Sequence, residues 1–285
     1  MSAIHPFTGA APATARPPTS HASARTAGLT RRAVQFASLL ACLLLWHVAA
    51  TQRVNLGLVT FANVPAPAEV LGAAKALVQS PKLLNHLGSS LLRIGVGFGL
   101  AAALGVGGGL LIGRLRGVHD VLMPPLEVLR PIPAVAWIPL AILMFPSSEA
   151  SMVFITFIGA LFPVLLNTVH GVEAVDARLV ASARSLGASR LAVFREVILP
   201  GALPSVVTGL AIGMGTAWFC LVTAEMISGQ FGIGYYTWMS YTIQNYADIV
   251  VGMLFIGVLG MGSSALVRWI GQALMPWRAV QEKRA

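Results

Sequence analysis

The chain has few charged residues and few cysteines, and both scarcities exclude classes of protein. Charged residues make up 10% of its 285 residues, against about 25% in an ordinary soluble domain. The two cysteines, Cys42 and Cys220, lie in apolar stretches and show neither a disulfide framework nor zinc-ligand spacing. The chain as a whole is 56% hydrophobic, with a mean hydropathy of +0.78. This composition indicates a membrane protein.

Signatures of energy conversion and gating are also missing from the sequence. There is no Gly-x4-Gly-Lys-Ser/Thr phosphate loop, so we do not expect the chain to hold ATP itself. Neither an inverted internal repeat nor a selectivity-filter motif is visible, which argues against a secondary transporter or a channel. An ATPase-independent secondary transporter is kept as the alternative class, and a membrane-integral scaffold as a third.

Six apolar stretches come close to the roughly 20 residues that a helix needs to cross a bilayer. The third carries three prolines, which bend or interrupt a helix. Arginines and lysines concentrate in the segments that are cytoplasmic if the N-terminus is inside, which predicts an N-in, C-in orientation. We attribute the net charge of +9 to these segments and expect no nucleic-acid partner. The sequence predicts an all-α integral membrane protein with about six transmembrane helices, at 33–52, 94–113, 131–148, 150–170, 201–224 and 249–267.

The polar segments divide the chain further. Residues 1–30, rich in Ala, Pro, Thr and Ser, are expected to be a disordered cytoplasmic tail. The first transmembrane helix occupies 31–52, and an outer segment with a short surface helix occupies 53–92. Residues 273–285 are expected to be a second cytoplasmic tail.

One charged segment, ARSLGASRLAVFREVILPGALP at residues 183–204, lies between the fourth and fifth apolar stretches and is therefore cytoplasmic. We expect a helix over Val172–Arg184 that Gly187 ends. Ser189 can then cap a second helix over Arg190–Val197.

The second helix carries an apolar ridge, Leu191 and Phe194, beside the charges of Arg190 and Arg195. Two prolines, Pro200 and Pro204, are expected to break the chain before the fifth span. The helix–turn–helix bracket would thus expose apolar side chains rimmed by positive charge, a surface suited to a groove on another protein.

The spacing of this bracket resembles the cytoplasmic motif of ABC importer permeases, Glu-Ala-Ala, three residues, Gly, nine residues, Ile-x-Leu-Pro. Here it reads Ala181-Ser182-Ala183, Gly187 and Val197-Ile198-Leu199-Pro200, with the leading Glu replaced by Ala181. The resemblance implies that segment 171–200 is a coupling loop that docks into a cleft of a separate ATPase. The expected contact residues are Ala181, Ser182, Ala183, Arg184, Gly187, Ser189, Arg190, Leu191, Phe194, Arg195, Leu199 and Pro200.

The resemblance extends over about 65–278, through stretches such as SLLRIGVGFGL, RPIPAVAWIPLAIL and AEMISGQFGIGY. These are similar to the permease branch for nitrate, sulfonates, taurine and bicarbonate, and related permeases take uncharged pyrimidine precursors. The implied core is a type I permease of MetI-like fold at 85–272. After the third span, 144–148 reads MFPSS, where sulfonate importers often have Trp-Phe-Gly-x-Gly, and this departure weakens the sulfonate assignment.

The same resemblance implies an assembly in the bacterial inner membrane. A second permease copy, cytoplasmic ABC ATPase subunits, an extracytoplasmic solute-binding protein and the lipid bilayer are the expected partners. The chain itself would be a transporter subunit and no enzyme, without metal or cofactor, because ATP binds to the partner subunit.

Five residues are candidates for the translocation path or its gate. Glu127 and Arg130 lie near the expected inner end of the third span, either beside the path of an anion or as an ion pair at the membrane surface. Glu225 follows the fifth span at its outer end, where it would contact the binding protein or gate the outer vestibule, with a solvated helix end as the alternative. Trp218 and Met226 would line the outer vestibule, with an interfacial anchor as the alternative for the tryptophan.

Removing part of the bracket tests the coupling hypothesis. Deletion of Arg184–Phe194, or substitution of Gly187, should abolish ATP-driven uptake while the protein still inserts into the membrane, because the ATPase loses its docking surface. Uptake and membrane abundance are measured together. A scaffold predicts unaffected uptake.

Overall fold

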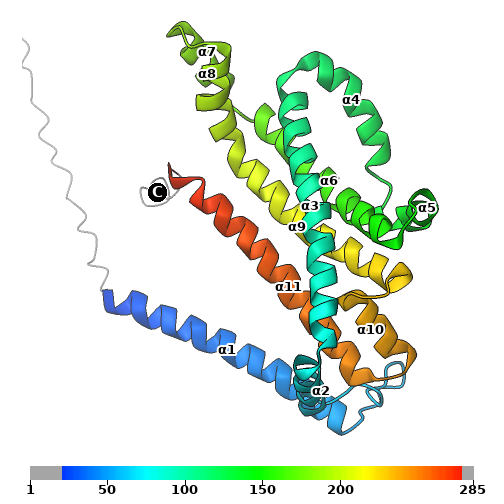
Figure 1. Ribbon diagram of the computed structural model, residues 1–285. Coiled ribbons are helices and arrows are strands. Elements are labelled where there is room, and N and C mark those ends of the chain that lie inside the picture. The colour runs from blue at the N-terminus through cyan, green and yellow to red at the C-terminus, as the bar shows by residue number, and fades with distance from the viewer. Residues whose placement is uncertain (1–20, 278–285) are drawn as a thin grey trace, which may run out of the picture. The chain divides into compact units, whose positions relative to one another are not determined.

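The fold is built from helices. The computed structural model describes residues 21–277, and of residues 21–31 only the backbone. Residues 1–62 and 63–285 form two units, each described by itself. The first contains α1 (Figure 1). The elements are α1 (His21–Thr51), α2 (Pro67–Gln79), α3 (Lys82–Arg114), α4 (Arg116–Leu129), η1 (Ala134–Trp137), α5 (Ile138–Met144), α6 (Ser148–Glu173), α7 (Ala177–Ser185), α8 (Arg190–Val193), η2 (Phe194–Ile198), α9 (Leu199–Ser228), α10 (Ile233–Thr242) and α11 (Tyr246–Ala273).

Helix α6 is the centre of the second unit and packs against both α3 and α9. Glycines of α3 lie directly against side chains of α6, so that the two backbones approach closely. Each pair is separated by the same number of residues, which means that α3 and α6 run parallel and in register. The pairs are Gly97 with Thr156, Gly105 with Val164, Gly109 with Thr168 and Gly113 with Val172.

Glycines four residues apart occur in α3 at 95/99, 105/109 and 109/113, a spacing typical of close helix packing in membranes. The last two pairs do pack on α6, whereas Gly95 and Gly99 face open space. The face of α3 that packs on α6 runs through Gly97, because residues four apart share a helix face. Residues 95 and 99 lie on a different face from 105 and 109.

The parallel course of α3 and α6 has a topological consequence. Both begin at the outer side, so the chain must cross the membrane again between the end of α3 and the start of α6. The segment available is α4 with η1 and α5, a helix pair bent by 83° at a short break. The third span is therefore a broken one that begins at Arg116. The prediction of a span at 131–148 is wrong, since residue 131 lies at the break itself.

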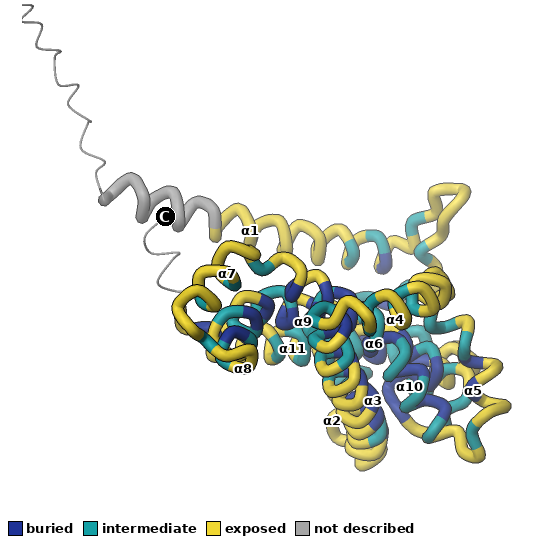
Figure 2. Tube along the Cα trace, turned by 90° about the horizontal axis from the view of Figure 1, so that it is seen from above, coloured by how far each residue is buried: buried dark blue, intermediate teal, exposed yellow. Residues whose placement is uncertain are grey.

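Helices α9 and α11 complete the second unit. Gly209 and Gly213 of α9 contact α6 in the antiparallel sense, and Gly271 of α11 contacts Val207 of α9. The end of α11 consequently lies on the same side as the end of α3. Figure 2 shows buried positions on α6 and α9 and exposed ones along most of α4, where none of the residues is buried.

Two further helices begin well before the predicted start. Helix α1 begins at His21, within the segment predicted to be disordered, while residues 1–20 and 278–285 lie outside the described residues. Helix α3 begins at Lys82 and not at Ile94. Its 33 residues reach about 50 Å, more than the ~30 Å hydrocarbon core, so its first turns extend past the apolar stretch. The expected surface helix of the outer segment is α2.

Replacing Gly109 tests the α3–α6 contact. A Cβ there would lie 2.6 Å from Thr168 Cβ, so Gly109→Ala should cost about 1–3 kcal/mol through overpacking. The matched control is Gly107→Ala, because nothing lies within 4 Å of a Cβ at that position. Thermal unfolding of both variants in nanodiscs is the measurement. Equal midpoints would contradict the close approach.

Candidate functional site

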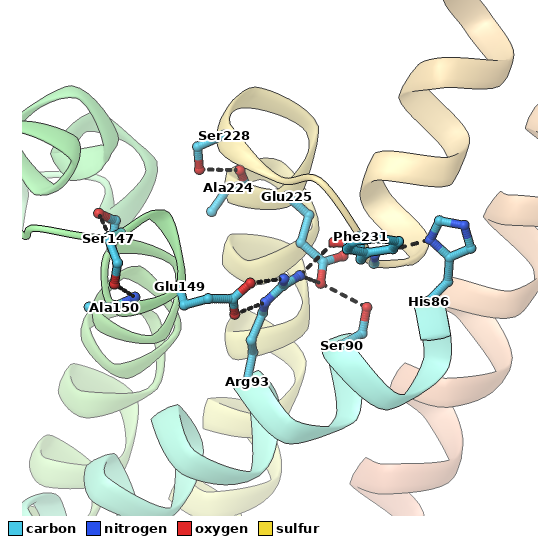
Figure 3. Close-up of polar contacts among 12 residues, drawn as sticks. His86, Ser90, Arg93, Ser147, Glu149, Ala150, Ala224, Glu225, Ser228 and Phe231 are labelled. Atoms are coloured by element: carbon cyan, nitrogen blue, oxygen red, sulfur yellow. Dashed lines mark hydrogen bonds and ion pairs between the residues drawn. The ribbon is translucent and has the colours of Figure 1, made fainter. Parts of the chain in front are cut away.

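Arg93, near the outer end of α3, lies at the centre of a polar cluster (Figure 3). Its Nε and Nη2 donate to the two carboxylate oxygens of Glu149 at 2.7 and 2.5 Å. Its Nη1 donates to Glu225 Oε1 at 2.8 Å and to the Phe231 carbonyl at 2.7 Å. One guanidinium therefore joins α3 to the first turn of α6, the last turn of α9 and the turn 229–232.

The carboxylate of Glu225 is held from several sides. Ser90 Oγ donates to Oε1 at 2.7 Å and accepts from the Ile233 amide at 3.0 Å. The Gly234 amide donates to Oε2 at 2.9 Å. These two amides open α10 and have no carbonyl acceptor within their own helix. The cluster therefore caps α10 with side chains that come from α3 and α9.

Gly232 closes the turn against this cluster. Its φ of +127° lies in the region that favours glycine, and a Cβ would overlap the Glu225 carboxylate. Its amide donates to Nδ1 of the buried His86 at 3.1 Å. Glycine is thus required at position 232 by both backbone conformation and space.

The two halves of the cluster differ in exposure. The side chains of Arg93 and Glu225 are 2% and 0% exposed, whereas that of Glu149 is 63% exposed. A buried charge within a membrane protein is stable only with charged or hydrogen-bonded partners. The Arg93–Glu225 half is buried, and the Arg93–Glu149 half is exposed at the N-terminus of α6, where the helix dipole favours a carboxylate.

The sequence reasoning missed this cluster. Arg93 lies between the expected outer segment 53–92 and the apolar stretch 94–113 and was given no role. The alternative of a solvated helix end for Glu225 is wrong because the side chain is buried. Trp218 is no interfacial anchor, because it is 3% exposed and its Nε1 donates to Ser263 Oγ at 2.8 Å. Met226 is half-buried beside the same apolar core. The signal in the sequence that could have indicated the cluster was a single arginine, Arg93, directly before the apolar stretch 94–113.

Arg130 lies at the break in the third span. It follows the last residue of α4, and both Glu127 and Arg130 are exposed. No ion pair among residues 21–277 joins them. Because α4 has 14 residues, Arg130 lies about 21 Å along the helix from its inner end. Both residues therefore lie toward the end of α4 that is away from the inner end of α3, and the ion pair considered from the sequence is not formed.

The cytoplasmic bracket has the local structure that its sequence predicts at two positions. Gly187 adopts a φ of +83° between α7 and α8, and the Ser189 hydroxyl accepts from the Ala192 amide at 3.2 Å. The bracket exposes Leu179, Leu186 and Leu191 by more than half of their surface.

A hollow of about 780 Å³ lies between the bracket and the inner end of α3. It is lined by Arg114, Leu115, Arg184, Ala188, Arg190, Leu191 and Phe194. Within the described part of the chain, these three arginines form no ion pair. The predicted contact residues Ala181, Ser182, Arg184, Gly187, Ser189, Arg190, Leu191 and Arg195 are exposed, and Ala183, Phe194, Leu199 and Pro200 are partly buried.

The helices around the bracket differ from the prediction. The chain breaks at Ala174–Asp176, so α7 is a separate helix that Asp176 caps. After α8, a π-helix leads into α9 without interruption, and the Leu199 amide bonds to the Phe194 carbonyl. Pro200 and Pro204 do not break the helix, contrary to the prediction. Pro200 has no amide hydrogen to donate, and the wide π turn directly precedes it.

Comparison with known proteins agrees with this architecture. Residues 95–280 match the family described as binding-protein-dependent transport system inner membrane component. The nitrate import permease protein NrtB of Synechocystis sp. is 32% identical over 75% of this chain and 81% of its own length. The putative aliphatic sulfonates transport permease protein SsuC of Bacillus subtilis is 34% identical over 79% and 81%, and the bicarbonate transport system permease protein CmpB of Synechococcus elongatus is 36% identical over 64% and 66%.

A solved structure has the same fold. The crystal structure of an amino acid ABC transporter with histidines aligns with a TM-score of 0.53 and 19% identity, covering 72% of this chain and 98% of that chain. The family match covers more than half of the sequence, and the described residues contain five apolar helices of spanning length, or six with the bent pair. The chain belongs to the binding-protein-dependent transport system inner membrane components and is a multi-pass inner-membrane permease of an ABC importer.

Proposed function

We propose that this permease carries a small oxyanion past Arg130. The observation that carries the proposal is the exposed guanidinium at the break of a bent span, without an ion pair in the described part of the chain. Discontinuous helices with a charged group at mid-membrane depth are the usual form of a transport site. Three of the relatives are named for nitrate, aliphatic sulfonates and bicarbonate, all of them oxyanions.

The assembly proposed around this path has two permease copies, two ATPase subunits and an extracytoplasmic binding protein. The exposed leucines and unpaired arginines of the bracket favour an ATPase as its cytoplasmic partner. The permease holds no nucleotide and needs no cofactor. Binding and hydrolysis of ATP by the partner would then shift the permease between inward-open and outward-open states.

Glu225, Trp218 and Met226 remain candidates for the outer gate. Their burial against the core supports a role in holding the gate helices and does not favour direct contact with solute. Arg130 and Glu127 are therefore the better candidates for contact with the transported anion.

Uptake by a reconstituted complex tests the transported class. The permease is reconstituted with its ATPase and binding protein, and uptake of labelled nitrate, bicarbonate, taurine and an alkanesulfonate is compared with that of sulfate and of an uncharged pyrimidine. We expect ATP-dependent uptake of one of the first four. Uptake without ATP would support a secondary transporter, and uptake of the uncharged solute alone would overturn the oxyanion class.

Substitution of Arg130 tests the path. Arg130→Ala should raise the half-saturating concentration of the anion about 10-fold or more, because a hydrogen bond to a charged group contributes about 1.5–3 kcal/mol. Arg116→Ala, at the other end of α4, is the matched control. Normal uptake by a well-expressed Arg130→Ala variant would remove this residue from the path.

A further inference from the structure

We propose that Arg93 is a positioning residue for transport. It holds the turn 229–232 and α10 to the outer ends of α3, α6 and α9, so that this outer face moves with the transmembrane helices as one body. The inference rests on the proposed transport function, but its central test is made on the permease alone.

Side chains hold the end of the turn 229–232 and the start of α10. Three consecutive amides, those of Gly232, Ile233 and Gly234, donate to side chains and not to backbone carbonyls. Two of the acceptors, Ser90 and Glu225, are themselves bonded to each other at 2.7 Å. The start of α10 is thus fixed by side chains whose geometry is set elsewhere.

Arg93 bonds both to the turn and to the carboxylate that caps α10. Its Nη1 bonds to the Phe231 carbonyl within the turn and to the Glu225 carboxylate that receives the Gly234 amide. A guanidinium presents its donors in a fixed planar fork, so partners on both edges are held in one geometry. No lysine could reach the same four acceptors with comparable geometry, because an ammonium has three donors around one nitrogen.

The two carboxylates bonded to Arg93 differ in their burial. Glu225 is fully buried, so loss of Arg93 would leave the charge of Glu225 buried without its cationic partner, which is strongly unfavourable. Glu149 is mostly exposed, and water can replace its bonds to Arg93. The α3–α9–turn connection is therefore the rigid part, while the α6 connection adds orientation through a bidentate pair.

Hydrogen exchange gives a local readout. Exchange of amides 232–234 is followed by mass spectrometry on the whole permease in nanodiscs, for the wild type, Arg93→Gln, Arg93→Lys and the control Glu69→Gln on α2. We expect Arg93→Gln to speed exchange at these amides about tenfold or more, with α6 and central α9 unchanged. Unchanged exchange at 232–234, or a uniform rise across all helices, would overturn the proposal.

Arg93→Lys keeps the measurement informative where Arg93→Gln does not fold, because it retains the buried positive charge. We expect Arg93→Lys to fold, to expose amides 232–234 partly, and to lower the maximal uptake rate about tenfold. The half-saturating concentration should stay within about twofold of the wild type, because Arg93 does not contact solute. A large rise in that concentration would instead place Arg93 in the transport path and overturn the positioning role.

A comparison of nucleotide states tests movement as one body. In the complex with the ATPase, amides 232–234 should be equally protected without nucleotide and with ATP and vanadate. Faster exchange in one state would mean that the cluster opens during the cycle, and the proposal would be wrong. If the wild-type permease forms no complex with an ATPase, the proposed function fails, while the exchange result on the isolated permease still decides the role of Arg93 in holding the turn.

Discussion

The close parallel contact between α3 and α6 determines the arrangement of the second unit. Glycines along one face of α3 let its backbone lie against α6 in constant register. Two neighbouring parallel spans require a return crossing between them, and the chain makes it with α4 and α5, broken at Arg130. The same register places the outer turns of α3 and α6 at one level, where Arg93 can reach Glu149.

Few of the cations among the described side chains form an ion pair there, and this difference between them separates two roles. Each of the three guanidinium nitrogens of Arg93 has a hydrogen-bond partner inside the protein. Arg130, Arg184 and Arg190 form no ion pair among residues 21–277. In a sequence with little charge, the internally satisfied arginine maintains the fold, and the unsatisfied ones are available to ligands and partner proteins.

The sequence predicted those features that depend on neighbouring residues. The fourth to sixth apolar stretches became α6, α9 and α11, and Gly187 and Ser189 have their expected turn and capping roles. The features that it could not predict depend on distant residues. Arg93 is 56 residues from Glu149 and 132 from Glu225, so no local pattern joins them. Hydropathy also failed for the third span, because it begins at Arg116, where charge and prolines dilute the apolar signal.

One continuous helix, made of α8, η2 and α9, joins the bracket to the outer polar cluster. From Arg190 to Ser228, through α8, η2 and α9, it has 39 residues, which span about 58 Å, with a π turn near its inner end and Pro204 within α9. A tilt of about 5° around its midpoint would displace each end by roughly 2.5 Å in opposite directions. Leu191 lies at one end of this helix and Glu225 near the other, so a small displacement at the cytoplasmic end is accompanied by an opposite one at the outer cluster.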